Sequence, residues 1–280
     1  MRAQAGRMSL AIHTNTSSAA GYRGALEGWA KAGITQVELN GAVVDAFLKT
    51  DTLAAARRIL TDNGLTAVSG TVGGGSLLEP SADHAAAFDG LKRRLEMFSI
   101  LGIKKAYTTT GSTQKLTQDD YKIVVELMRR VGDTARQAGM MAMVEFVRTS
   151  TYMSTLPTAL KYIREAAHPN LGPMFDCYHF WSGHNRLEDL ELLRPGEIQH
   201  VHFQDVPDMP RELLDNNTRL IPGDGVSPLV AILKKLQEKG YAGPLSVELF
   251  ATNFTTGDPF AIATEIRRKA EAVMRSAGVL

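Results

Sequence analysis

Residues 139–177, GMMAMVEFVRTSTYMSTLPTALKYIREAAHPNLGPMFDC, contain the pattern that decides the fold. A short apolar run at Met141–Phe146 is followed by helical periodicity at Leu156–Ala167, and a second apolar run follows at Gly172–Cys177. Strand, helix and strand in this order are typical of a βαβ unit around a parallel sheet. This stretch therefore predicts one repeat of an α/β fold.

The same alternation runs along the whole chain. Strands are predicted at Ser9–His13, Gln36–Asn40, Thr66–Thr71, Lys105–Thr109, Met141–Phe146, Gly172–Cys177, Ile198–Gln204 and Leu245–Phe250. Helices are predicted near Gly24–Ala32, Thr52–Asn63, Ala82–Leu101, Thr117–Ala138, Leu156–Ala167, Arg186–Leu193, Ser227–Lys239 and Pro259–Ala277. A glycine follows the last apolar turn of five of these helices, where a left-handed residue is needed. Repeated strand and helix in a chain of 280 residues favours a single (β/α)₈ TIM barrel over a doubly wound sheet.

The chain shows no sign of a division into domains or of a membrane segment. No proline-rich or serine-rich linker interrupts it, so we expect one domain over residues 1–280. Residues 1–7 are basic, but the apolar stretch Met8–Ile12 is too short for a signal-peptide core, and we expect a frayed N-terminal extension. No apolar run approaches the ~18 residues of a membrane helix, which predicts a soluble protein with no membrane partner.

Charge and cysteine content limit the partners and the compartment. Lysine and arginine total 31 against 30 for aspartate and glutamate, so no strong field attracts nucleic acid or anionic lipid. This balance favours a small neutral substrate. The one cysteine, Cys177, cannot form an internal disulfide, which fits a reducing compartment and predicts a cytoplasmic location.

Each of the last four predicted strands ends in an ionisable residue. These residues are Glu145, Asp176, His202 and Glu248. In a TIM barrel the carboxyl ends of the strands build the active site, so the four side chains should share one rim. Buried carboxylates need compensation, and one divalent cation compensates several at once. Taken alone, each of these residues has an alternative interpretation to that of a metal ligand, as a solvent-facing charge or as a salt-bridge partner.

The chemistry of this set indicates which metal it would hold. Three carboxylates and one imidazole form a hard, oxygen-dominated set. Such a set suits Mn²⁺, Mg²⁺ or Co²⁺, whereas structural zinc sites are usually rich in cysteine. We therefore predict one divalent ion, with manganese as first choice and magnesium as second, and cobalt or zinc as further possibilities.

Other polar and aromatic residues close to these strand ends are candidates for substrate contact. His179, three residues after Asp176, is predicted to lie in the mouth and to hold a substrate oxygen, with a structural imidazole as the alternative. Trp181 follows closely and is predicted to wall the substrate pocket or to join the core. Glu38, at the end of the second strand, has the depth to touch the substrate.

Two residues beside His202 have predicted supporting roles. Asp205 follows His202 by three residues and is expected to orient the imidazole ring or a loop, since metal-bound histidines usually need an acceptor for the other ring nitrogen. His200 is expected to point to the opposite face from His202, against a helix, and to be structural.

At these residues the sequence resembles the xylose isomerase-like barrel superfamily. It is most similar to the sugar phosphate isomerase/epimerase branch, with its ketose 3-epimerases, inosose dehydratases and hydroxypyruvate isomerases. The resemblance covers nearly the whole chain. Its landmarks are VEF at 144–146, FDCYH at 175–179, HVHFQD at 200–205, PGDG at 222–225 and VEL at 247–249.

The resemblance implies roles for the site residues. It implies one metal held by the four strand-end residues, which chelates a substrate carbonyl and a neighbouring hydroxyl and so acidifies the carbon-bound proton between them. It also implies that Glu145 and Glu248 act as acid and base on opposite faces of that carbon, and that His179 polarises the substrate oxygen. A family arginine is expected after the seventh strand. Arg211 and Arg219 are the candidates, and Arg211 is preferred.

The predicted function is therefore a divalent-metal-dependent isomerase or epimerase of a ketose or keto-polyol. An inosose dehydratase-like lyase is the alternative, because it begins with the same proton abstraction. A carbohydrate-binding barrel without turnover is a third possibility. AP endonuclease activity is disfavoured, because endonuclease IV relatives use additional histidines where this chain has Ser69-Gly70-Thr71 and Tyr107-Thr-Thr-Thr110. Barrel helices often pair through their exposed faces, so a homo-oligomer stays an open alternative.

Overall fold

The computed structural model describes residues 6–73, 75–80 and 83–280. Residues 1–5 of the predicted N-terminal extension, and Ala82 at the predicted start of a helix, lie outside these ranges. None of the helices in the described ranges is both long enough and apolar enough to cross a membrane.

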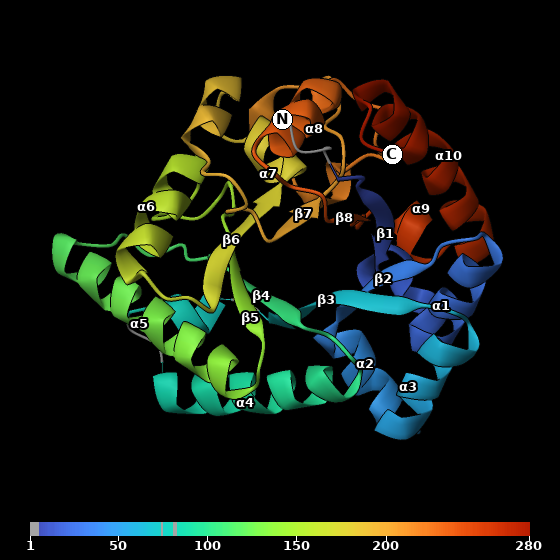
Figure 1. Ribbon diagram of the computed structural model, residues 1–280, viewed down its shortest axis with the longest axis horizontal. Helices are drawn as coiled ribbons and strands as arrows, with labels where there is room; N and C mark the ends of the chain where they lie inside the picture. Colours follow the sequence, from blue (N-terminus) through green and yellow to red (C-terminus); the bar gives the residue numbers. More distant parts are fainter. Residues whose placement is uncertain (1–5, 74, 81–82) are drawn as a thin grey trace.

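The strands of the described residues form a closed parallel barrel in the order β1 to β8 (Figure 1). Their bounds are β1 Ser9–His13, β2 Gln36–Asn40, β3 Thr66–Gly73, β4 Lys105–Thr109, β5 Met141–Glu145, β6 Leu171–Asp176, β7 His200–His202 and β8 Pro244–Val247. This confirms the predicted (β/α)₈ fold. The strands β7 and β8 are shorter than predicted. The chain leaves β7 after His202, and Asp205 instead pairs with Leu220 in an antiparallel bridge.

Helices surround the barrel. The α-helices are α1 Gly21–Lys31, α2 Gly41–Leu48, α3 Leu53–Asp62, α4 His84–Ile100, α5 Gln118–Gln137, α6 Leu156–Ala166, α7 Cys177–Ser182, α8 Leu229–Glu238, α9 Thr252–Thr255 and α10 Pro259–Ala277. Short 3₁₀ segments are η1 Thr14–Ala20, η2 Gly75–Leu78, η3 Leu187–Leu192, η4 Arg211–Leu213 and η5 Asn216–Thr218. The predicted helix at 186–193 is the 3₁₀ segment η3. The short helices α2 and α7 directly follow β2 and β6, and α9 follows β8 after a short connection. All three lack the length that periodicity needs to reveal them.

The long helices begin at side chains that satisfy free backbone N–H groups. Thr117 and Asp120 form a capping box at the start of α5, and Thr155 and Asp258 cap α6 and α10. The buried faces of these helices pack on the outside of the barrel, where Leu26 and Trp29 of α1 are fully buried. The hydrophobic core therefore lies mainly between the sheet and the ring of helices.

The inward face of the strands positions the functional residues. Side chains two residues apart on a strand share a face. Met143 and Met174 pack with Tyr107 in one buried cluster, and Glu145 and Asp176 stand two residues further along the same strands. The interior is thus apolar below these two carboxylates and acidic at the carboxyl ends of the strands.

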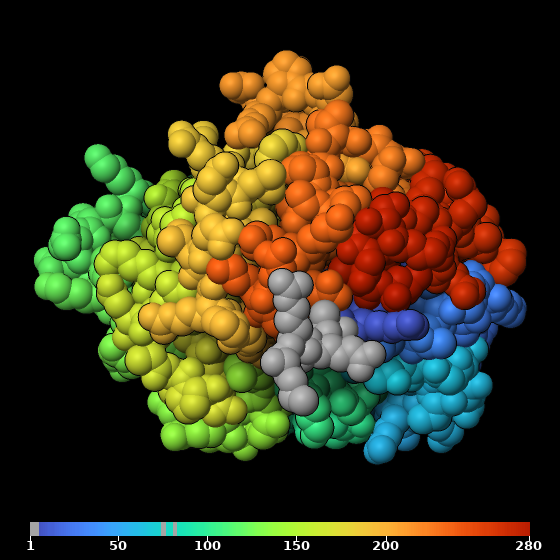
Figure 2. Space-filling model, turned by 45° about the horizontal axis from the view of Figure 1, so that its top comes forward, coloured from blue at the N-terminus to red at the C-terminus, as the bar shows by residue number. Residues whose placement is uncertain are grey.

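The loop between β7 and α8 extends beyond the barrel. Figure 2 shows this orange segment standing out from the rest of the surface. Two apolar residues on it, Met209 and Leu213, are exposed. The loop nevertheless returns to the barrel at Leu220, so its second half lies close to the carboxyl ends of the strands.

Close packing of α4 on β3 gives a test of the fold. A Cβ on Gly70 would lie 2.6 Å from the ring of Phe98, which is fully buried. Gly70→Ala should therefore lower the free energy of unfolding by about 1–3 kcal/mol. Gly90→Ala, within the same helix α4 and with no atom near the added methyl, should raise it by about 0.5–1 kcal/mol. Urea denaturation measures both, and equal effects would contradict this packing.

Candidate metal centre and active site

His202 is the centre of a buried cluster of carboxylates. Its Nδ1 atom lies 3.0 Å from Oε1 of Glu145, 3.3 Å from Oδ2 of Asp176 and 3.4 Å from Oε2 of Glu248. All four residues are at most 5% exposed. The structure thus brings the four predicted metal ligands together from the ends of β5, β6, β7 and β8.

Arg219 joins this cluster from the loop after β7. Its Nη1 atom donates to Oδ2 of Asp176 and to Oε2 of Glu248, at 3.0 Å each. The guanidinium is 2% exposed and lies over the rings of Tyr178 and Phe250. It therefore compensates part of the negative charge on the buried carboxylates.

The structure places the two candidate arginines, Arg211 and Arg219, in different surroundings. Arg211 lies in η4 on the exposed part of the loop, and its Nη1 atom donates to the carbonyl oxygen of Gly183 at 2.6 Å. Arg219 directly precedes Leu220, and the antiparallel bridge between Asp205 and Leu220 returns the chain to the barrel. This bridge joins residues far apart in the loop, so spacing along the sequence did not reveal it.

The carboxylates of the cluster differ in proton affinity. Burial raises the pKa of Glu145 to about 7, although His202 opposes the shift. Burial would also raise the pKa of Asp176, but Arg219 and His179 hold it well below its usual range. Glu145 can therefore carry a proton near neutral pH beside an ionised carboxylate, and such pairs can divide acid and base roles.

His179 offers a hydrogen-bond donor at the same rim. Asp176 caps the short helix α7 by accepting from the backbone N–H of His179 at 2.6 Å. Nη2 of Arg219 lies 3.1 Å from Nε2 of His179, and a guanidinium can only donate, so Nε2 accepts. Burial lowers the pKa of His179 to about 4, so the neutral ring carries its proton on Nδ1. This N–H is free to meet a substrate oxygen.

Trp181 and Asp205 occupy supporting positions. Trp181 packs against the apolar cluster of Tyr178, Val206 and Leu214. Asp205 accepts from the backbone N–H groups of four residues, Val206, Gly223, Gly225 and Ser227, at 2.9–3.0 Å. Asp205 therefore orders the loop, which was one of its two predicted roles, and it does not contact His202 in any described hydrogen bond.

The structure shows the contacts of Glu38 and corrects the predicted orientation of His200. Glu38 is fully buried, and its two oxygens lie 3.2 Å from Nε2 of His202 and 2.8 Å from Nε2 of His200. It therefore contacts two histidines in the barrel interior. His200 was placed on the wrong face, because residues two apart on a strand point the same way. Both imidazoles point into the barrel.

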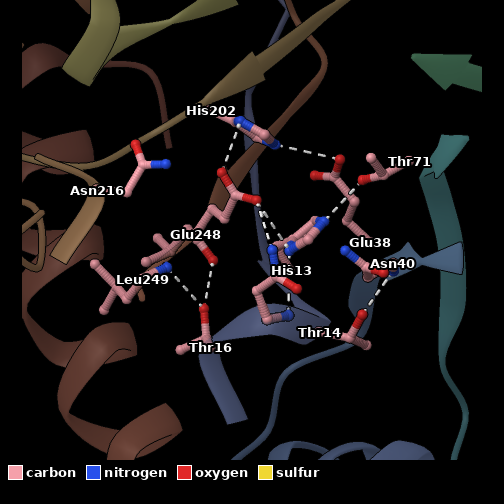
Figure 3. Close-up of polar contacts among 12 residues, drawn as sticks. His13, Thr14, Thr16, Glu38, Asn40, Thr71, His202, Asn216, Glu248 and Leu249 are labelled. Atoms are coloured by element: carbon pink, nitrogen blue, oxygen red, sulfur yellow. Dashed lines mark hydrogen bonds and ion pairs between the residues drawn. The ribbon is translucent and has the colours of Figure 1, made fainter. Parts of the chain in front are cut away.

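Three residues of the cluster were not identified as candidates from the sequence. Asn15 donates from Nδ2 to Oε1 of Glu248, and Gln204 donates from Nε2 to Oδ2 of Asp176, at 3.0 Å each. His13 lies 3.4 Å from Glu248 (Figure 3). His13 ends β1, so the strand-end rule that found the other residues would have found it too. Asn15 also lines a cavity of about 520 Å³ with Tyr22 and Phe47.

The residues present fit a divalent metal and a polar ligand. Three carboxylate oxygens and one imidazole nitrogen converge, and this is a donor set that divalent ions accept. Three buried polar atoms of the cluster have no hydrogen-bond partner among the described residues, namely Nδ1 of His179, Oε1 of Gln204 and Nε of Arg219. Because buried polar groups are normally paired, these atoms indicate a site built for a polar ligand.

Comparisons with known proteins agree with this fold. The family model described as "Xylose isomerase-like TIM barrel" matches residues 26–276. The chain is similar to inosose isomerase of Bacillus licheniformis, with 30% identity over 174 residues, 61% of this chain and 63% of that protein. It is also similar to 3-dehydroshikimate dehydratase of Pseudomonas putida, with 24% identity over 168 residues, 59% of this chain and 26% of that protein. The chain thus spans less than two thirds of the length of these curated relatives.

Solved structures share the fold. A crystal structure of IOLI protein with a bound zinc atom superimposes with a TM-score of 0.87. The alignment covers 96% of this chain and 99% of that one at 21% sequence identity. This likeness shows that the chain shares the fold of that protein.

The position of Arg219 gives a prediction on stability. Arg219→Gln leaves Asp176 and Glu248 without their cation, so the free energy of unfolding of the metal-free protein should fall by about 3–5 kcal/mol. Arg211→Gln, on the exposed part of the same loop, should cost less than about 1 kcal/mol. Chemical denaturation of both variants with and without a chelator measures the difference. A larger loss for Arg211→Gln would contradict the placement of Arg219.

Proposed function

The chain belongs to the xylose isomerase-like TIM barrel family, and on this premise we propose a divalent-metal-dependent isomerase or epimerase acting on an uncharged ketose or keto-polyol. One observation carries the proposal. Two buried carboxylates, Glu145 and Glu248, approach the same nitrogen of His202 from different strands and have different partners. A pair of this kind can remove a proton from carbon and return one.

The metal would be held by Glu145, Asp176, His202 and Glu248. Manganese is the first choice, and magnesium, cobalt and zinc are the others. When bound there, it would supply Lewis acidity that lowers the pKa of a carbon-bound proton next to a substrate carbonyl.

The protein groups divide the proton transfers among themselves. One glutamate takes the proton from the carbon next to the carbonyl, and the other delivers a proton to the opposite face of that carbon in an epimerisation. Return of the proton to the neighbouring carbon gives an isomerisation. In the metal-free protein, burial raises the pKa of Glu145 to about 7, so this carboxyl is the readier of the cluster to take up a proton. The Nδ1–H of His179 would donate to the substrate oxygen on which negative charge develops.

Charge at the rim favours an uncharged substrate. Arg219 already donates to Asp176 and Glu248. Arg148 donates to the carbonyl oxygens of Ser182, Leu214 and Arg211. Neither guanidinium therefore presents a free fork to a carboxylate or a phosphate, which is how arginine recognises such groups. A substrate with hydroxyl and carbonyl groups alone fits this arrangement better.

A lyase acting on a similar substrate is the second candidate. It is favoured by the similarity to 3-dehydroshikimate dehydratase, and dehydration would begin with the same proton abstraction. The protonated form of Glu145 or the ring of His179 would then protonate the leaving hydroxyl. Loss of water, detected by mass spectrometry, separates this reaction from isomerisation.

Isotope exchange tests the proposal. The protein with Mn²⁺ should incorporate deuterium from D₂O next to the carbonyl of at least one neutral ketose or inosose. Glu145→Gln and Glu248→Gln should each reduce this exchange by about 10²–10⁴-fold, because each amide can neither accept nor deliver the proton. Proton NMR of the substrate measures the rate.

The control for this experiment is Asp208→Asn, which changes an exposed carboxylate on the loop after β7. It should exchange deuterium at the wild-type rate. If a panel of neutral substrates acquires no deuterium while the protein holds metal, the proposed reaction is wrong. Normal exchange in Glu248→Gln would remove that residue from the mechanism. Retained binding without any exchange would favour a carbohydrate-binding barrel.

A further inference from the structure

Glu38 lies in the barrel interior, on the far side of His202 from the proposed metal ligands. It comes from β2 and is fully buried. Its Oε1 atom lies 3.2 Å from Nε2 of His202, and its Oε2 atom lies 2.8 Å from Nε2 of His200. Figure 3 shows His202 between Glu248 and Glu38, with a contact from each of its two ring nitrogens.

The chemistry of these contacts fixes where the protons are. A fully buried carboxylate is costly unless its oxygens accept hydrogen bonds, and here each oxygen meets one imidazole nitrogen. An ionised carboxylate only accepts, so Nε2 of both rings carries a proton. In the neutral form of His202, the lone pair is then on Nδ1, the nitrogen that faces Glu145, Asp176 and Glu248.

Neighbouring rings restrict the orientation of His202 further. The rings of His13, Tyr107 and His200 meet it edge to face, with centroids 5.3–6.0 Å away. These side chains leave the imidazole little room to turn, and Glu38 then selects which nitrogen faces the carboxylates. Packing and hydrogen bonding therefore act on the same ring.

We propose that Glu38 is a positioning residue, anchored by His200, that holds His202 with Nδ1 directed at the divalent ion. This inference rests on the proposed metal site. In this role Glu38 acts through His202 and contacts neither the substrate nor the metal. An acceptor on the second nitrogen of a metal-binding histidine fixes its tautomer and raises its basicity.

A second metal ion is the competing interpretation of the same residues. Ligand atoms of Glu38, His200 and His202 lie within 4.8 Å of one another, which is close enough for an ion. However, such an ion would take Nε2 of His202 while the first took Nδ1, and it would replace two good hydrogen bonds. The number of ions per chain distinguishes the two interpretations.

Metal affinity is the first measurement. In titrations with Mn²⁺, Glu38→Ala should raise the dissociation constant by about 10–100-fold. Glu38→Gln keeps an acceptor oxygen and should raise it less. Gln36→Ala is the matched control, because Gln36 shares the strand and face of Glu38 but accepts from Ser9. Its affinity for the metal should equal that of the wild type.

A double-mutant cycle tests the anchoring role of His200. His200→Phe removes the donor to Oε2 of Glu38 and should weaken metal binding in the wild-type background. The same change should have little further effect in Glu38→Ala, because the carboxylate that it anchors is already absent. Additive losses in the double variant would overturn the role of His200.

Nitrogen NMR gives a readout that does not depend on catalysis. We expect a slowly exchanging proton on Nε2 of His202 in the metal-free and the zinc-loaded protein, and its loss in Glu38→Ala. If the wild type binds no divalent metal, the proposed function fails, and this proton still decides whether Glu38 holds the ring. Unchanged metal affinity in both Glu38 variants, an unprotonated Nε2, or two ions per chain that fall to one in Glu38→Ala would each overturn the proposal.

Discussion

The burial of carboxylates around one imidazole is the constraint on which the rest of the site depends. Glu38, Glu145, Asp176 and Glu248 are all at most 5% exposed, and His202 contacts each of them. Arg219 supplies one full positive charge to this group. Four carboxylates beside one guanidinium leave an excess of negative charge that burial makes costly. A divalent cation would offset that excess.

The barrel makes such a concentration of charge possible. Each parallel strand delivers alternate side chains to the interior, and the carboxyl ends of the strands meet at one rim. Methionines fill the interior below Glu145 and Asp176, whereas histidines and Glu38 occupy it near β7 and β2. Glu38 and the histidines therefore support the proposed metal ligands from within the barrel.

The fold and the convergence of the strand-end residues could be predicted from the sequence because both depend on local patterns. Alternating apolar runs and helical periods revealed the strands, and the strand ends gave Glu145, Asp176, His202 and Glu248. Arg219 could not be chosen over Arg211, since the loop after β7 is placed by the distant pairing of Asp205 with Leu220. The contact of Glu38 with His202 also spans the barrel and has no local signal. His200 was misplaced by a wrong use of the strand period, which applied correctly would have placed it inside.

The central claim is that these side chains hold one divalent ion, and elemental analysis of the purified protein tests it most directly. After loading with manganese and removal of free ions, the wild type should retain about one equivalent per chain. His202→Ala and Glu248→Ala should lose it, whereas Asp208→Asn should retain it. No bound ion in the wild type, or full retention in His202→Ala, would contradict the account and leave only the barrel.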